Sequence, residues 1–73
     1  PNPVKDILTV TFDNSYSQIA LTICDQAARV VRTETIPSNT TSYTLDLQNL
    51  KSGVYFITIK ADDNISTHKV VIY

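Results

Sequence analysis

The stretch LKSGVYFITI, residues 50–59, decides the fold of this chain. Gly53 is the only glycine in the sequence, and it stands directly before the strongest strand pattern. Because glycine reaches a positive φ without steric cost, a single glycine here predicts a backbone shape that other residues rarely adopt. The residues after it are β-branched or aromatic, and Thr58 is the only polar one among them. We interpret 54–59 as a central strand that is buried on both faces.

Further strand patterns flank this stretch on both sides. Residues 6–12, 17–24 and 43–48 alternate apolar and polar side chains, which is the period of a half-buried strand. Residues 65–73 form the last expected strand, after a turn signal at 62–64. With turns about every eight to twelve residues, the pattern predicts an all-β fold, a small antiparallel immunoglobulin-like β-sandwich of six to seven strands.

The segment 28–36 also has strand character, but its register is ambiguous. Arg32 and Glu34 would share a face with Val30, which is typical of a solvated edge strand whose inward register is weakly enforced. A seventh strand is expected only if the region of Pro3 pairs at a sheet edge.

Length and composition limit the classes of protein that fit. Seventy-three residues correspond to one domain, 1–73, which we interpret as a fragment of a longer protein because there is no initiator Met. One cysteine and one histidine exclude an intrachain disulfide and a structural zinc site, so we expect no metal and no cofactor. Seven acidic against six basic residues provide no basic face for nucleic acid. No apolar run approaches the roughly 18 residues of a membrane helix, so we expect no membrane insertion.

Two side chains are candidates for chemistry. His68 lies in a strand pattern without a nucleophile or an orienting group beside it in the sequence, so we interpret it as a structural or surface histidine. Cys24 stands at the outward end of a strand with no basic neighbour to lower its pKa, which favours an unreactive thiol.

Other polar and aromatic patterns have simpler interpretations. The clusters at 13–14 and 62–64 lack the ligand spacing and glycine of a calcium loop, which favours turns. Asn39 and Asn64 match the short N-glycosylation pattern. Of the four tyrosines, Tyr43 and Tyr55 fit core positions, which leaves too few rings for a sugar-stacking platform. With no phosphate loop and no paired catalytic carboxylates, we conclude that the chain is not an enzyme.

The chain contains, in order, Pro1-Asn2-Pro3, Asp25 with Arg29, the pattern Leu-x-x-Gly-x-Tyr-x-x-x-Ile over residues 50–59, and Lys69. Together these motifs resemble the C-terminal sorting domain (type A) of proteins exported by the type IX secretion system of Bacteroidetes. The resemblance covers essentially the whole chain, and its most specific parts are the Leu-x-x-Gly-x-Tyr-x-x-x-Ile core and a late lysine. The motif residues are Pro1, Asn2, Pro3, Asp25, Arg29, Leu50, Gly53, Tyr55, Ile59 and Lys69.

The chain departs from the family pattern at two positions. The family usually has Asp-x-x-Gly-Arg at the second turn, and here Ala28 stands in place of that glycine. Ala28 therefore predicts that this turn avoids a positive φ or takes a different type. Cys24 occupies a position where the family often carries an aromatic residue.

The resemblance implies a non-catalytic secretion signal. Its partners would be the outer-membrane translocon and a sortase-like signal peptidase of the type IX system, and the domain is commonly removed at the cell surface. The cargo would be in the periplasm in transit, and then at the outer membrane or cell surface, or secreted. We expect the last strand to contact the translocon, because an edge strand can pair with a partner's sheet. The residues of this expected contact are Lys69, Val70, Val71, Ile72 and Tyr73.

Two other functions remain open at this point. The chain is alternatively an accessory β-sandwich module of a secreted enzyme that binds carbohydrate or protein, or a spacer without a partner. An edge-strand dimer is a further alternative.

Overall fold

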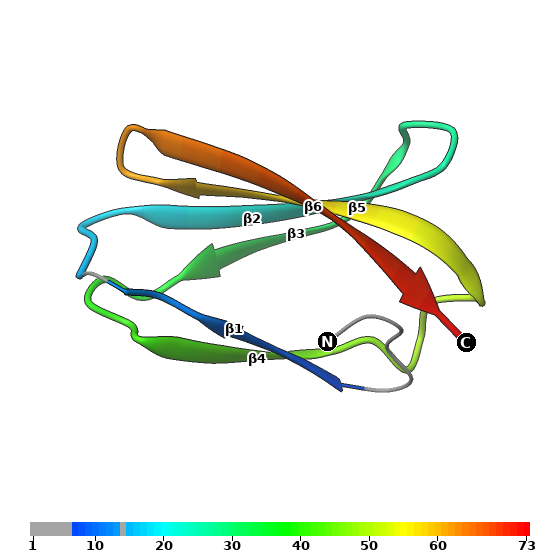
Figure 1. Cartoon of the computed structure of the whole chain (residues 1–73), viewed down its shortest axis with the longest axis horizontal. Helices are drawn as coiled ribbons and strands as arrows, with labels where there is room; N and C mark the ends of the chain where they lie inside the picture. The colour runs from blue at the N-terminus through cyan, green and yellow to red at the C-terminus, as the bar shows by residue number, and fades with distance from the viewer. Residues whose placement is uncertain (1–6, 14) are drawn as a thin grey trace.

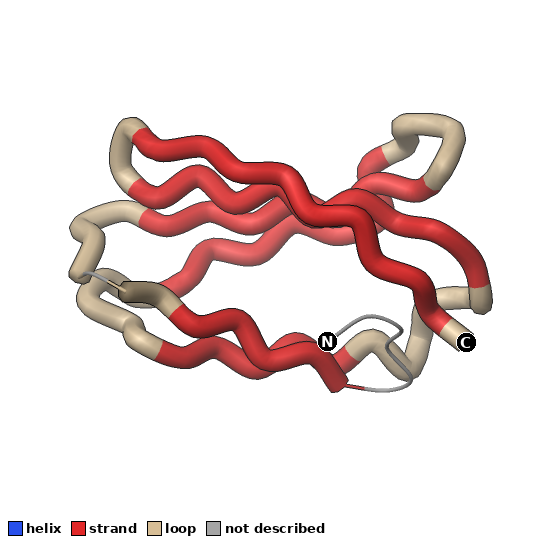
Figure 2. Tube along the Cα trace, in the orientation of Figure 1, coloured by secondary structure: helices blue, strands red, loops and turns tan. Residues whose placement is uncertain are grey.

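The computed structural model describes residues 7–13 and 15–73, and these form six strands and no helix (Figure 2). Strands β3, β2, β5 and β6 form one antiparallel sheet in that order, and β1 and β4 form a second, smaller one. The two sheets lie as facing layers (Figure 1), which confirms the predicted small antiparallel β-sandwich. The region of Pro3, where a seventh strand was expected, lies outside the described residues. The strand bounds are β1 Ile7–Thr11, β2 Ile19–Asp25, β3 Val30–Ile36, β4 Ser42–Asp46, β5 Gly53–Ala61 and β6 Asn64–Ile72.

The core lies between the two layers. Strand β2 supplies alternate residues to it, as its period of two predicts. The largest side chains that are fully buried come from both sheets and from the segment after β4: Leu21, Ile23, Ile36, Leu45, Leu47 and Ile57. The described residues bury no polar or charged side chain completely. Apolar burial between the layers, at about 1.5–3 kcal/mol per large side chain, is therefore the main stabilising term.

Strand β5 is central, between β2 and β6, but it is buried on one face only. Tyr55, Ile57 and Ile59 are buried toward the smaller sheet, whereas Phe56 on the opposite face is 36% exposed. The prediction of burial on both faces is therefore wrong. Its cause is the number of layers: among the described residues, only β1 and β4 cover the four-stranded sheet, and they cover one side of it.

Strand β3 is an edge strand, as predicted, but its faces differ from the expectation. Val30 pairs with Cys24 and Arg32 pairs with Ile23, so Val31 is an extra residue on β3. Such a β-bulge reverses the side on which the preceding residues point. Val30 therefore lies on the outer face and Arg32 on the inner face, and the expectation that they share a face is wrong.

The turn predicted at 62–64 is present between β5 and β6. Asp62 has a φ of +54°, a conformation that Asp tolerates better than most residues. Its carboxylate accepts hydrogen bonds from the backbone N–H groups of Ser17 (3.2 Å) and Gln18 (2.9 Å). Asp62 thus forms part of the turn between β5 and β6, and its carboxylate also holds the backbone that leads into β2.

Candidate functional site

The motif pair Asp25 and Arg29 forms the turn between β2 and β3. One oxygen of the Asp25 carboxylate accepts hydrogen bonds from the N–H groups of Ala27 (2.9 Å) and Arg29 (3.0 Å), and the other accepts from Arg29 Nε (3.0 Å). The N–H of Arg29 is the main cause that holds the pKa of the Asp25 carboxyl below its ordinary value; partial burial opposes this, and the charge of Arg29 and the N–H of Ala27 add to it. The carboxylate therefore acts as the internal clamp of this turn.

Ala28 in the same turn has a φ of +64°. The expectation that the turn avoids a positive φ is therefore wrong. The backbone N–H of Asp25 donates to the Arg29 carbonyl oxygen (2.9 Å), and the N–H of Ala28 donates to the Asp25 carbonyl oxygen (3.0 Å). These bonds and the Asp25 clamp hold Ala28 in the left-handed region, which crowds its Cβ against the backbone. The turn thus keeps a shape suited to glycine without a glycine.

The motif residues between 50 and 59 build the connection from β4 to β5 and the centre of the core. Leu50 packs partly buried against the core. Gly53 begins β5 with a φ of +153°, where side chains are strained although there is room for a Cβ. The Tyr55 hydroxyl donates a hydrogen bond to the Lys51 carbonyl oxygen at 2.7 Å while its ring is buried. Ile59, further along the same face of β5, is also buried. The prediction that Tyr55 is a core residue is confirmed, and these motif side chains determine shape.

The last strand does not bring its five expected contact residues to one surface. Strand β6 pairs with β5 and is the outermost described strand of its sheet. Val70 and Ile72 are buried in the core, whereas Lys69 and Tyr73 are exposed and Val71 is half-buried. Any partner that meets β6 from outside would therefore contact Lys69, Val71 and Tyr73 before the other two.

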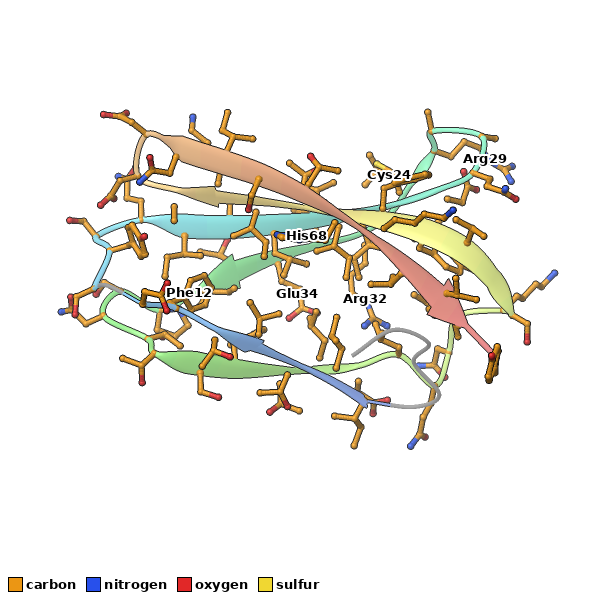
Figure 3. The ribbon with its side chains drawn as sticks, in the orientation of Figure 1. Phe12, Cys24, Arg29, Arg32, Glu34 and His68 are labelled. Atoms are coloured by element: carbon orange, nitrogen blue, oxygen red, sulfur yellow. The ribbon has the colours of Figure 1, made fainter. Side chains whose placement is uncertain are left out.

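Polar bridges join β3 to β4 at one lateral side of the sandwich. Arg32 Nη1 donates a hydrogen bond to the Asp46 carbonyl oxygen, and the Tyr43 hydroxyl donates one to Glu34 Oε1. The bond to Glu34 is the main cause that raises the pKa of Tyr43, with burial and the charge of Glu34 adding to it. Figure 3 shows Arg32 and Glu34 between the two layers, so these charged side chains connect the sheets.

The opposite lateral side, between β1 and β6, holds a groove of about 440 Å³. Its apolar lining includes Val10 of β1 and Phe12, whose ring contacts Tyr16 edge-on at a centroid distance of 6.2 Å. Ser66 and His68 of β6 also line it, and His68 Nε2 lies 3.2 Å from Ser66 Oγ. The sequence analysis missed this Ser–His pair, although residues two apart on a strand share a face. No third group orients the histidine within the described residues, so the pair lacks the parts of a nucleophilic triad.

The family model that describes the secretion system C-terminal sorting domain matches the chain over residues 1–73. The chain belongs to this family. The resemblance stated from the motifs is thereby confirmed, and the domain is a C-terminal sorting signal for type IX secretion rather than an accessory carbohydrate- or protein-binding module. No curated protein matches the chain in sequence.

Family membership also sets the general properties of this sorting domain. Sorting domains are in general non-catalytic, they act with the type IX secretion machinery, and their cargo is secreted or displayed at the cell surface. The part of the sorting domain that the structure describes contains no helix able to span a membrane. Nor do three or more metal-ligating side chains gather among those residues.

Proposed function

We propose that this sorting domain is a folded, non-catalytic address label that the outer-membrane translocon of the type IX system recognises in its folded state. The observation that carries this proposal is the placement of the family motif: Tyr55 and Ile59 lie in the core and Asp25 clamps a turn. Side chains committed to the fold cannot at the same time be the surface that a partner contacts. These core and turn residues of the motif therefore preserve a shape, and that shape presents the signal together with the exposed motif residue Lys69.

The proposal extends to the route of the cargo. Residues 1–73 are one domain of a longer exported protein, which passes through the periplasm before it reaches the outer membrane, the cell surface or the medium. A sortase-like peptidase of the same system then removes the domain at the surface. Family membership supports an encounter with the secretion machinery, and the peptidase step is the finer part of the proposal.

Within this proposal β6 is one contact strand of the translocon. Lys69, Val71 and Tyr73 face outward and form the contact, while Val70 and Ile72 anchor the strand to the core. The outward side chains of this outermost described strand support the contact. A dimer through a strand edge stays a prediction, which sedimentation of the purified domain at several concentrations measures.

The test is export of a reporter protein that carries this domain at its C-terminus in a bacterium with a type IX system. Leu21→Asp places a charge in the centre of the core and should unfold the label and abolish export. Thr44→Asp introduces the same negative charge at an exposed position of β4 and should leave export unchanged. Protease resistance of the domain reports folding in each variant. Export of an unfolded Leu21→Asp fusion would show that the signal is a linear peptide and would overturn the proposal.

A further inference from the structure

The outer face of the four-stranded sheet carries no covering layer among the described residues. Its side chains occupy the outward register positions of β3, β2, β5 and β6, and none of these residues is buried. A row of four threonines crosses the middle of this outer face: Thr33 pairs with Thr22, Thr22 with Thr58, and Thr58 with Thr67. The hydroxyls of Thr58 and Thr67 lie 3.2 Å apart. Because threonine side chains are short, the centre of the outer face lies lower than the longer side chains around it.

Large apolar side chains flank the threonine row. Val30 is 61% exposed, Phe56 36% and Ile65 67%, and all three occupy outward positions. The solvated face of an antiparallel sheet ordinarily carries polar residues at these positions. Val30 and Phe56 lie in the register row on one side of the threonines and Ile65 in the row on the other side. Apolar side chains exposed across one uncovered face favour a surface that meets another protein.

The charges on the outer face have one sign. Lys60 and Lys69 occupy outward positions on β5 and β6, and no outward position of the four described strands holds an Asp or Glu. On the described strands the acidic side chains are Asp25, Glu34 and Asp46, of which the first two are engaged in the turn and in the bridge to β4. A partner with complementary charge would present carboxylates beside apolar groups.

We propose that the outer face docks on an acidic protein surface of the export machinery, with Phe56 and Ile65 in apolar contact and Lys60 and Lys69 opposite carboxylates. This inference rests on the proposed function and names the chemistry of its partner. It also places the main contact on the broad side of the sheet, across four strands, rather than at the edge of β6. The flat threonine row lets the partner approach closely between the apolar and charged groups.

The experiment uses the same reporter fusion and compares charge reversals. Lys60→Glu with Lys69→Glu places like charges opposite the partner and should lower the exported fraction about tenfold or more. Lys51→Glu changes charge at an exposed loop position off the outer face and should stay within about twofold of the unmodified fusion. Phe56→Ser should lower export severalfold with its charge unchanged. Protease resistance of each variant separates lost docking from lost folding.

A photocross-linking residue at Thr22, in the centre of the outer face, identifies what lies against it during export, with the same residue at Thr44 of β4 as the control. We expect a cross-link to a protein of the export machinery from position 22 only, and its loss with the double charge reversal. Cross-linking only to lipid or to a second copy of the fusion would overturn the inference. Export of the double reversal at the level of Lys51→Glu would overturn it as well while leaving the proposed function intact. If the unmodified fusion is not exported, both fall together.

Discussion

The two lateral sides of the sandwich both have polar residues at inward positions of an outer strand, but these residues make different contacts on each side. Each outer strand of the four-stranded sheet carries polar residues at inward register positions: Arg32 and Glu34 on β3, and Asn64, Ser66 and His68 on β6. On the first side these groups reach across to β4 and close the gap between the layers. On the second side they line a groove beside β1, where the Ser66 and His68 side chains lie within hydrogen-bond distance of each other. Within residues 7–13 and 15–73, neither side chain bonds across to the second sheet.

Within the described residues, bonds between the layers close one lateral side of this sorting domain, while the other side holds a groove. Inward-pointing charged residues on an edge strand prevent unwanted strand pairing. Where they also bond to the facing sheet, as Arg32 and Glu34 do, they hold the two layers together on that side. The β3–β4 side is therefore the side that side-chain bonds close. The β1–β6 side keeps apolar residues and uncommitted polar groups within reach of a partner.

The largest expected difference between the two sides is in the stability lost when a core leucine is shortened. Two leucines that are register partners allow the comparison. Leu45 of β4 and Leu8 of β1 are register partners, but Leu8 lines the groove while Leu45 is fully enclosed. Leu45→Ala should destabilise the domain by about 3–5 kcal/mol and Leu8→Ala by about 2 kcal/mol, because the groove side can relax around the missing atoms. Urea unfolding of both variants gives the comparison. Equal losses would show that the groove is packed as tightly as the closed side.

The second-largest expected difference is in the stability that the polar side chains of each side contribute. Arg32→Ala removes the bond to the Asp46 carbonyl oxygen and the ion pair with Glu34 at 3.8 Å, and should cost about 1–2 kcal/mol. Ser66→Ala on the groove side should change the free energy of unfolding by no more than about 0.5 kcal/mol. Lys51→Ala controls for loss of a positive charge at an exposed site. A cost for Arg32→Ala no greater than that of Lys51→Ala would mean that the bridge does not close this side.

The sequence predicted the rigid parts of the fold well. Period-two alternation placed Ile19, Leu21 and Ile23 inward because one face of β2 meets a single core, and the turn residues at 62–63 were evident from their composition. Alternation fails where the backbone is irregular. The extra residue Val31 reverses the faces of β3, and no pattern of side chains reports such a bulge.

The candidate surfaces were harder to predict than the core. The sequence identified the family motif, but a motif made of core and turn residues does not show which surface is presented. The apolar run in β5 led to the wrong prediction that both of its faces are buried. Phe56 is as apolar as a core residue, but no layer of the described residues covers it. The charge pattern across four strands depends on register between distant segments, which only the structure supplies. Ser66 and His68 lie two residues apart on β6, so their pairing follows from strand alternation within that one segment.

Alkaline pH provides a further test of the closed side through Tyr43. The folded state raises the pKa of Tyr43 above the ordinary 10.0, so the protonated hydroxyl stabilises the fold fully below pH 10.0. That contribution is lost as the pH rises through the raised pKa, when the phenolate meets Glu34. Tyr43→Phe should cost about 1 kcal/mol at neutral pH through the lost hydrogen bond.

Urea midpoints between about pH 8 and pH 11 check this prediction, since that range spans ordinary tyrosine titration. The unmodified domain should lose more stability over this range than Tyr43→Phe, which retains the other three tyrosines as an internal control. An identical loss in both proteins would mean that Tyr43 and Glu34 do not interact across the closed side.

The smallest expected effect lies in the turn that leads into β3 and thus into the closed side. Ala28 sits at a φ of +64° because the Asp25 clamp and the hairpin bonds fix the turn. Ala28→Gly relieves crowding of the Cβ but adds freedom to the unfolded chain, and the net gain should be about 0.5–1 kcal/mol. Ala27→Gly, one residue earlier, adds the same freedom where the φ is not positive and should destabilise the domain instead. Opposite shifts of the two urea midpoints are expected; two shifts toward lower stability would mean that the turn stores no strain at Ala28.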